Sequence, residues 1–362
     1  ECIKHGIEPL VTMSHYEPPI NLVLNHDGWA SREVIDMFVR FVEVICERYK
    51  NKVKYWLTFN EVDSMIRHPY TTGALVEDRF PGRNFQEVIF QAMHHQFVAS
   101  ALATKICHEK IPGSKVGCML TSSCVANYPY DCHPDSVFGA LNYQRFAHFY
   151  FGDAFCLGEI PGYVKRYWRE HDCAPKMNDE DLALIKKYTV SFFALSYYRS
   201  TTVDQQMGRN LSIKGDTGGL LGRKNPYLKE TEWGWPIDPK GLRYVLNVLH
   251  DRYHLPLLIT ENGCGVPDVL TEDEKVHDDY RIDYLRQHIY ACREAITDGV
   301  DLMGYSPWSA IDLVSTHQGV TKRYGFIYVN RDEFDLKDLR RIRKDSFYWY
   351  KKVISTNGED LD

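Results

Sequence analysis

Two stretches of the sequence decide the fold: YWLTFNE (Tyr55–Glu61) and LLITENG (Leu257–Gly263). Each is a short apolar run, rich in aromatic or β-branched residues, that ends in a carboxylate beside an amide. Runs of this kind are typical of buried strands in a parallel sheet. Because such sheets carry their chemistry at the carboxyl ends of the strands, we interpret Glu61 and Glu261 as a pair of functional carboxylates.

Strand and helix signals alternate along the whole chain. Apolar runs predict strands near residues 8, 54, 116, 193, 257 and 302. Helical spacing predicts helices over about 35–46, 85–108, 143–164, 179–188, 241–253, 282–296 and 339–353. Repeated units of this kind predict an α/β fold, the TIM (β/α)8 barrel. A closed barrel of this type has eight strands, so we expect the first two strand–helix units to be missing from the front.

We predict that residues 1–362 form a single barrel domain that is truncated at its N-terminus. The chain starts at Glu1 without an initiator Met and enters a strand-like run almost at once. Six strands would leave two open edges, which are sites for pairing with another chain. A second chain that carries the missing strands, or a contact within a homo-oligomer, remains an alternative to truncation.

The composition excludes several classes of protein. With 362 residues and 44% hydrophobic content, the chain can bury a large core. A formal charge of −6 argues against nucleic acid as the main partner. The 10 cysteines show no C-x-x-C spacing, which favours a reducing compartment over a disulfide framework. No apolar run approaches the ~20 residues of a membrane span, and the start is not a signal peptide, so we expect a cytoplasmic protein.

Two local signals carry narrower predictions. Thr271 with Glu274 forms a capping-box pattern, which predicts the start of the helix that follows. The polar, glycine-rich segment 207–229 reads as a long surface loop. It is either a disordered insertion or a wall of a binding cleft, and the pattern does not separate the two.

Two carboxylates at strand ends suit the cleavage of a glycosidic bond. One acid must protonate the leaving oxygen while a second carboxylate attacks or activates water. The two groups need unlike environments, so that one stays protonated near neutral pH. A single strand-end glutamate is more often an ion pair or a helix cap, but two such motifs in one chain favour glycoside hydrolysis.

The motifs resemble those of family 1 glycoside hydrolases. TFNE (58–61) is similar to the acid/base signature and ITENG (259–263) to the nucleophile signature, and VTMSHYEP (11–18) and WGWPI (233–237) also resemble family segments. The resemblance implies a retaining mechanism with Glu61 as acid/base and Glu261 as nucleophile, their carboxyl groups about 5–5.5 Å apart. It implies no metal and no organic cofactor.

The resemblance also assigns a sugar-binding rim. His15 and Asn60 would bind sugar hydroxyls, Tyr198 would hold the nucleophile, and Trp308 would lie under the sugar ring. A lone His or Tyr at a strand end is more often a core residue, and a Trp is more often core packing. The positions of these residues at strand ends, on the same rim as the two acids, favour a functional role. The family's first two strands normally supply a Gln for the sugar and an Arg beside the nucleophile, and we find neither strand here.

The segment after Trp308 narrows the substrate. Relatives that act on unmodified sugars usually carry a Glu there, whereas SAIDLVS (309–315) has none. Ser315, Lys322 and Tyr324 resemble the family's clamp for a 6-phosphate, with donors that suit charge-assisted hydrogen bonds. The related 6-phospho-β-galactosidases place a Trp directly after the clamp Ser, where this chain has Thr316.

We therefore predict a glycosidase that cleaves 6-phospho-β-glucosides, such as cellobiose 6'-phosphate, to glucose 6-phosphate and an aglycone or sugar. The alternatives are a catalytically incomplete barrel that acts as a sugar-phosphate-binding or subunit-like protein, an unphosphorylated β-glucosidase and a 6-phospho-β-galactosidase. No other cluster suggests a metal: His94 and His95 are adjacent in a helical pattern, and Cys132-His133 has no partners at zinc spacing.

Overall fold

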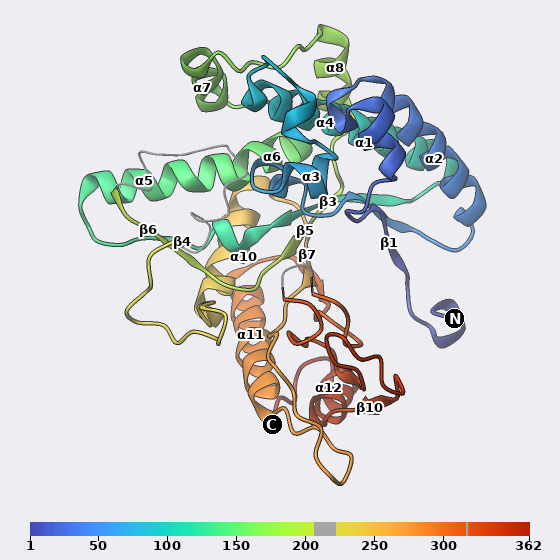
Figure 1. Ribbon diagram of the computed structural model, residues 1–362, viewed down its shortest axis with the longest axis vertical. Helices are drawn as coiled ribbons and strands as arrows, with labels where there is room; N and C mark the ends of the chain where they lie inside the picture. The colour runs from blue at the N-terminus through green and yellow to red at the C-terminus, as the bar shows by residue number, and fades with distance from the viewer. Residues whose placement is uncertain (206–221, 316–317) are drawn as a thin grey trace. The chain divides into compact units, whose positions relative to one another are not determined.

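The computed structural model of the protein describes residues 1–205, 222–315 and 318–362 (Figure 1). The chain forms two compact units, and each is described by itself. Unit 1 contains residues 1–194, 201–224 and 253–256. Unit 2 contains residues 195–200, 225–252 and 257–362.

Parallel strands form the framework of the fold. Their hydrogen-bonded order is β1-β2-β3-β5-β7-β8. The strands of this order are β1 (Leu10–Ser14), β2 (Tyr55–Phe59), β3 (Lys115–Thr121), β5 (Phe192–Ser196), β7 (Leu257–Glu261) and β8 (Leu302–Tyr305). All six lie where the apolar runs predicted strands. Strands β1 to β3 belong to unit 1, β7 and β8 to unit 2, and β5 contributes residues to both.

The register of unit 1 explains one of its small residues. Leu10 lies opposite Tyr55, and Leu57 lies opposite Gly117. A Cβ atom on Gly117 would come within 2.5 Å of the Phe192 ring, so only glycine allows this aromatic side chain to pack on β3.

Helices of unit 1 bury their apolar faces. Helix α2 (Glu33–Tyr49) buries the stripe that begins at Val34 and ends at Cys46, and it packs against α4 (Phe85–Lys110) (Figure 1). Most of α4 is buried, as expected of a helix inside an α/β fold. Among the described residues, the further α-helices of this unit are α1 (Ile20–His26), α3 (Pro69–Gly73), α5 (Pro134–Gln144), α6 (Tyr150–Gly152), α7 (Gly162–His171) and α8 (Asp179–Lys187). Two short strands that we did not predict, β4 (Asn127–Pro129) and β6 (Thr201–Val203), pair in parallel.

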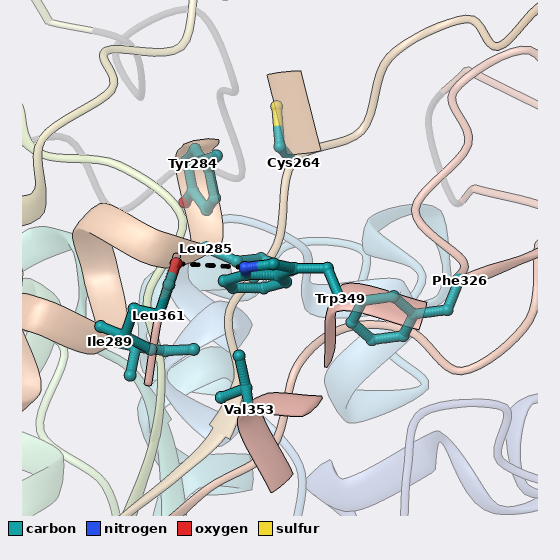
Figure 2. Close-up of a cluster of buried hydrophobic side chains, with 8 residues drawn as sticks. All are labelled: Cys264, Tyr284, Leu285, Ile289, Phe326, Trp349, Val353 and Leu361. Atoms are coloured by element: carbon teal, nitrogen blue, oxygen red, sulfur yellow. Dashed lines mark hydrogen bonds between the residues drawn. The ribbon is translucent and has the colours of Figure 1, made fainter. Parts of the chain in front are cut away.

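Unit 2 has an apolar core that is built mainly from two helices (Figure 2). Helix α11 (Asp279–Asp298) supplies Leu285 and Ile289, and α12 (Asp345–Ser355) supplies Trp349 and Val353. The indole N–H of Trp349 donates to the carbonyl of Leu361 at 3.2 Å, which ties the last residues of the chain to this core. The third helix, α10 (Pro239–Tyr253), contributes Tyr253 to unit 1.

Two local predictions were wrong. The terminal helix begins at Asp345, because Arg341–Arg343 form strand β10, which pairs antiparallel with β9 (Ile327–Val329). The capping box does not start α11. Thr271 instead accepts the N–H of Lys275 at 3.0 Å within a turn where Glu274 has a positive φ of 59°, and the helix follows Asp278.

Two other predictions stay as they were. Most of the predicted loop 207–229 lies outside the described residues, and one truncated barrel domain over 1–362 stays a prediction. None of the helices within 1–205, 222–315 and 318–362 has the length and apolar content that crossing a membrane requires.

Candidate active site

In unit 1 the candidate residues gather where β1 and β2 end. Ser14 pairs with Phe59 in the last step of the register, and the N–H of Asn60 donates to the Ser14 carbonyl at 2.9 Å. His15 is exposed, Asn60 is buried and Glu61 is half-buried. Glu61 has a positive φ of 42°, an uncommon conformation for a residue with a side chain, and such outliers concentrate at functional sites.

A tyrosine that the sequence analysis did not select contacts Glu61. The hydroxyl of Tyr16 donates to Oε2 of Glu61 at 2.5 Å. Burial, and then the charge of the Glu61 carboxylate, raise the pKa of Tyr16 well above its usual value. The phenol is therefore a neutral donor at physiological pH. Its position within VTMSHYEP, one residue after His15, is the sequence feature that could have identified it as a site residue.

A second carboxyl lies close to this pair. Asp63 is fully buried, and burial raises its pKa to about 7 against the opposing effect of Arg67. Its Oδ1 accepts the N–H of Thr121 at 2.9 Å, while the Arg67 guanidinium lies 3.5 Å from Oδ2. Asp63 therefore changes its charge near neutral pH.

In unit 2 a tyrosine and the backbone hold Glu261. This residue ends β7 and is buried. The Tyr198 hydroxyl donates to its Oε2 at 2.7 Å, and the N–H of Tyr197 donates to its carbonyl at 2.9 Å. Next to it, the fully buried Asn262 donates to the Tyr197 carbonyl and accepts from the Tyr305 hydroxyl, both at 2.5 Å. These bonds orient the end of the strand.

Trp308 lies beside this strand end. Its backbone N–H donates to the Asn262 carbonyl at 2.9 Å, and its side chain is half-buried. A Cβ atom on Gly263 would lie 2.0 Å from the Trp308 carbonyl oxygen. Glycine is therefore required for the two backbones to approach each other.

Lys322 is a buried cation among aromatic rings. Its ammonium lies 3.6 Å from the centre of the Trp235 ring, 5.3 Å from that of Trp233 and 5.8 Å from that of Tyr324. Burial, with help from the nearby Arg199, lowers the pKa of Lys322 to about 8. Within the described part of the chain, no carboxylate pairs with this ammonium. Aromatic faces stabilise a buried cation only in part, so the group favours an anionic ligand.

The other two clamp residues are placed differently. Tyr324 is buried, which raises its pKa, and its ring lies 6.1 Å from that of Tyr198. Ser315 is half-buried and its N–H donates to the Gly319 carbonyl at 2.7 Å. The structure thus brings Lys322 and Tyr324 together, and among the described residues Ser315 forms no hydrogen bond with either. Thr316, which carried the choice between glucose and galactose, lies outside the described residues.

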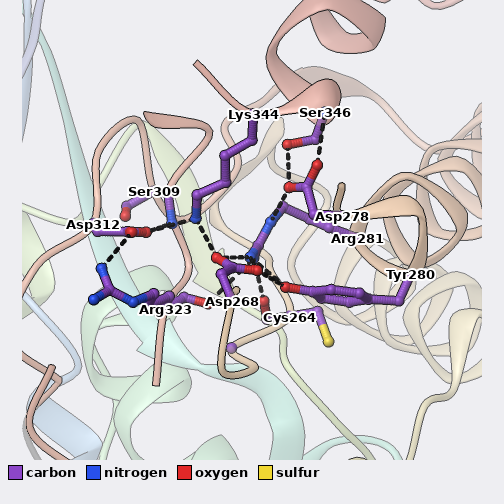
Figure 3. A network of polar contacts seen from close by, with 12 residues as sticks. Cys264, Asp268, Asp278, Tyr280, Arg281, Ser309, Asp312, Arg323, Lys344 and Ser346 are labelled. Atoms are coloured by element: carbon purple, nitrogen blue, oxygen red, sulfur yellow. Dashed lines mark hydrogen bonds and ion pairs between the residues drawn. The ribbon is translucent and has the colours of Figure 1, made fainter. Parts of the chain in front are cut away.

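A buried ionic network supports the segments that carry Glu261, Lys322 and Tyr324 (Figure 3). The Lys344 ammonium donates to Asp268 at 2.5 Å and to Asp312 at 2.7 Å. Asp312 also accepts from Arg323, the neighbour of Lys322, at 2.9 Å. Arg281 donates to the Cys264 carbonyl at 2.5 Å and pairs with Asp268 at 3.0 Å. The network therefore links the segment after Glu261 to the loop that carries Lys322 and Tyr324.

Comparison with known proteins decides the family. The family model for Glycosyl hydrolase family 1 matches residues 1–359. The chain belongs to glycosyl hydrolase family 1. It is accordingly a glycosidase, and the predicted α/β barrel class is confirmed, because the structure resembles the family 1 β-glucosidase from Thermotoga maritima with a TM-score of 0.82. That match has 31% sequence identity and covers 99% of this chain and 76% of the other.

Two curated relatives are more similar in sequence to this chain than the Thermotoga maritima enzyme is. The chain is 49% identical over 363 residues to the aryl-phospho-beta-D-glucosidase BglH of Bacillus subtilis (strain 168). It is 47% identical over 362 residues to the phospho-cellobiase of Klebsiella oxytoca. Each match covers 100% of this chain and 76% of the relative.

Other polar candidates have protein partners. His94 lies 3.0 Å from the Asp181 carboxylate, and His95 lies 2.8 Å from the Trp29 carbonyl. Across the described ranges, no three His, Cys, Asp or Glu residues are grouped to hold a metal ion. The separation of about 5–5.5 Å between the Glu61 and Glu261 carboxyl groups stays a prediction.

Proposed function

We propose that this family 1 glycosidase hydrolyses 6-phospho-β-glucosides with retention of configuration. Glucose 6-phosphate and an aglycone or sugar would be released, and cellobiose 6'-phosphate is a suitable substrate. The observation that carries the proposal is the buried ammonium of Lys322, which lies among aromatic rings and pairs with no carboxylate in the described ranges. A phosphate would supply the missing negative charge.

The reaction follows from the two carboxylates. Glu261 attacks the anomeric carbon while Glu61 protonates the leaving oxygen, which gives a covalent glycosyl-enzyme. Glu61 then removes a proton from the water that releases the sugar. The hydrogen bond from Tyr198 orients the Glu261 carboxylate for the attack. Asn60 and His15 lie at the ends of neighbouring strands, where they are suited to bind sugar hydroxyls.

The phosphate would be bound by groups of different chemistry. Lys322 supplies a charge, Tyr324 a phenol that burial keeps protonated, and Ser315 a hydroxyl. Donors to an anion form short, strong hydrogen bonds, and each contributes about 1.5–3 kcal/mol. Trp308 supplies an apolar surface for the sugar ring.

The names of the relatives support the same substrate class. They include an aryl-phospho-beta-D-glucosidase, a phospho-cellobiase and several 6-phospho-beta-glucosidases at 44–49% identity. The relative named beta-glucosidase A is more distant, at 33% identity. We also propose a cytoplasmic location, because the nine cysteines whose side chains the structure describes are free thiols, as is usual in a reducing compartment. We propose no partner beyond this small-molecule substrate, and a homo-oligomer stays a prediction.

The reaction is tested by proton NMR during hydrolysis of 4-nitrophenyl 6-phospho-β-glucoside. We expect the β-anomer of glucose 6-phosphate to appear first, and we expect Glu261→Gln to abolish its release. First appearance of the α-anomer would contradict retention. Binding of glucose 6-phosphate by the parent chain without turnover would replace the proposal with the binding-protein alternative.

A further inference from the structure

Tyr16 occupies an unusual position next to Glu61. It follows β1 by two residues and has a positive φ of 55°, as does its neighbour Glu17 at 51°. Two consecutive residues in this conformation turn the chain sharply after His15, and the turn directs the phenol toward Glu61. A positive φ is costly for residues other than glycine, and it persists only where the surrounding structure enforces it.

The groups around this hydrogen bond are of mixed charge. His15 and Glu17 belong to the segment after β1. The charge of Glu61 acts to raise the pKa of both His15 and Tyr16. From the short helix Val62–Ile66 come Asp63 and the hydroxyl of Ser64, which also bonds to Tyr16. Arg67 follows this helix and faces Asp63, and the N–H of Thr121 at the end of β3 donates to Asp63.

We propose that Tyr16 is a positioning residue that makes Glu61 a stronger acid by holding its ionised form. This inference rests on the proposed role of Glu61 as the acid/base. The phenol of Tyr16 is neutral, so it stabilises the carboxylate but gives no comparable stabilisation to the protonated acid. It also fixes Oε2, so that the orientation of the carboxyl group is set before substrate binds. No atom is transferred to or from Tyr16 during the cycle.

The consequence concerns both steps of the reaction. Glu61 must be protonated when the leaving group departs and ionised when water attacks. A pKa that is too high would slow the second step, and one that is too low would slow the first. Asp63 lies next to this pair, and the charge of Glu61 adds to burial in raising the pKa of Asp63.

The test is the pH profile of kcat/KM for Tyr16→Phe, which keeps the ring and removes the hydroxyl. The basic limb reports the acid/base of the free enzyme, and we expect it to move up by about one pH unit. The acidic limb, which reports the nucleophile, should stay in place. Tyr70→Phe is the matched control, because Tyr70 is an exposed tyrosine of the same unit. A basic limb that does not move would overturn the proposal.

A second variant covers failure of Tyr16→Phe to fold. A fluorotyrosine introduced at position 16 keeps the shape and makes the phenol a stronger donor, so the basic limb should move down. A limb that stays in place or moves up would overturn the proposal. If Asp63→Asn moves the limb and neither change at Tyr16 does, the limb belongs to Asp63 and the proposal fails.

The outcome can be separated from failure of the proposed function. If the chain prefers unphosphorylated glucosides, the same profile is measured on them. If no substrate is hydrolysed, the carboxyl carbon of Glu61 is titrated by carbon-13 NMR, with Glu61→Gln for assignment. Its pKa should again rise by about one unit in Tyr16→Phe, and an unchanged value would contradict the inference.

Discussion

The Lys322 ammonium lies 3.6 Å from the centre of the Trp235 ring, and its side chain is almost completely buried. The buried ammonium is surrounded by aromatic faces instead of water, and in the described part of the chain it pairs with no carboxylate. The lowered pKa of about 8 follows from that loss of water. A phosphorylated substrate would restore the missing charge.

Replacement of Lys322 should separate two classes of substrate. Lys322→Met keeps an unbranched apolar stem among the rings and removes the charge. We expect kcat/KM on a 6-phospho-β-glucoside to fall by about 100-fold, mainly through KM, because a charge-assisted contact is lost. Activity on the unphosphorylated glucoside should change little. Steady-state kinetics on both substrates checks this, and equal losses would contradict a role in phosphate binding.

The pH dependence of KM should follow the same group. The pKa of Lys322 in the folded protein is about 8, so the ammonium is present below that pH and is lost above it. We expect KM for the phosphorylated substrate to rise by about tenfold per pH unit above about 8, since only the ammonium binds the anion. KM for the unphosphorylated twin serves as the control and should not follow this curve.

The free energy of unfolding of the unliganded protein should increase with pH, whereas substrate binding should weaken. Because the pKa of Lys322 is lowered on folding, the unfolded state binds more protons between about pH 8 and 10.5. Stability contributed by this group therefore rises with pH across that window and is constant below it. Denaturant titrations at several pH values should show that the free energy of unfolding rises more steeply with pH in the parent than in Lys322→Met across this window. Parallel curves would indicate that Lys322 is not desolvated.

A glycine beside the clamp offers a steric test. A Cβ atom on Gly265 would lie 2.6 Å from the Tyr324 ring and 2.7 Å from the Lys322 side chain. Gly265→Ala should displace both residues and raise KM for the phosphorylated substrate by about tenfold more than for the unphosphorylated one. Gly162→Ala is the control, since nothing lies within 4 Å of its Cβ position. Equal kinetics in the two variants would count against the clamp.

The ionic network should matter for stability. Lys344→Met leaves Asp268 and Asp312 buried without their shared cation, which should cost about 3 kcal/mol in unfolding free energy. Lys275→Met removes the exposed pair with Asp273 and should leave the denaturation midpoint unchanged. Chemical denaturation compares the two variants, and similar midpoints would show that the network is not a major source of stability.

The strands were predictable because a buried parallel strand has a local signature. Apolar runs such as Tyr55–Phe59 and Leu257–Glu261 end at polar residues, and the structure confirms a strand at each. The β10 segment was misjudged because its pairing with β9 is a non-local contact. Thr271 and Glu274 were misjudged because the same spacing also suits a turn.

The site was predictable only in part. The pattern of carboxylates at strand ends selected Glu61 and Glu261, and the family resemblance assigned their roles and selected Lys322. Tyr16 was overlooked because a tyrosine after a strand is usually packing, and its contact depends on a positive φ that no pattern announced. The network residues were overlooked because they share no local pattern: Asp268, Asp278, Arg281, Asp312, Arg323 and Lys344.

The most direct test of the central claim is the ratio of kcat/KM for 4-nitrophenyl 6-phospho-β-glucoside to that for its unphosphorylated twin. Two charge-assisted contacts to the phosphate predict a ratio of about 100 or more for the parent protein. The ratio should fall toward one in Lys322→Met. A parent ratio of one or less would contradict the claim that this chain acts on phosphorylated glucosides.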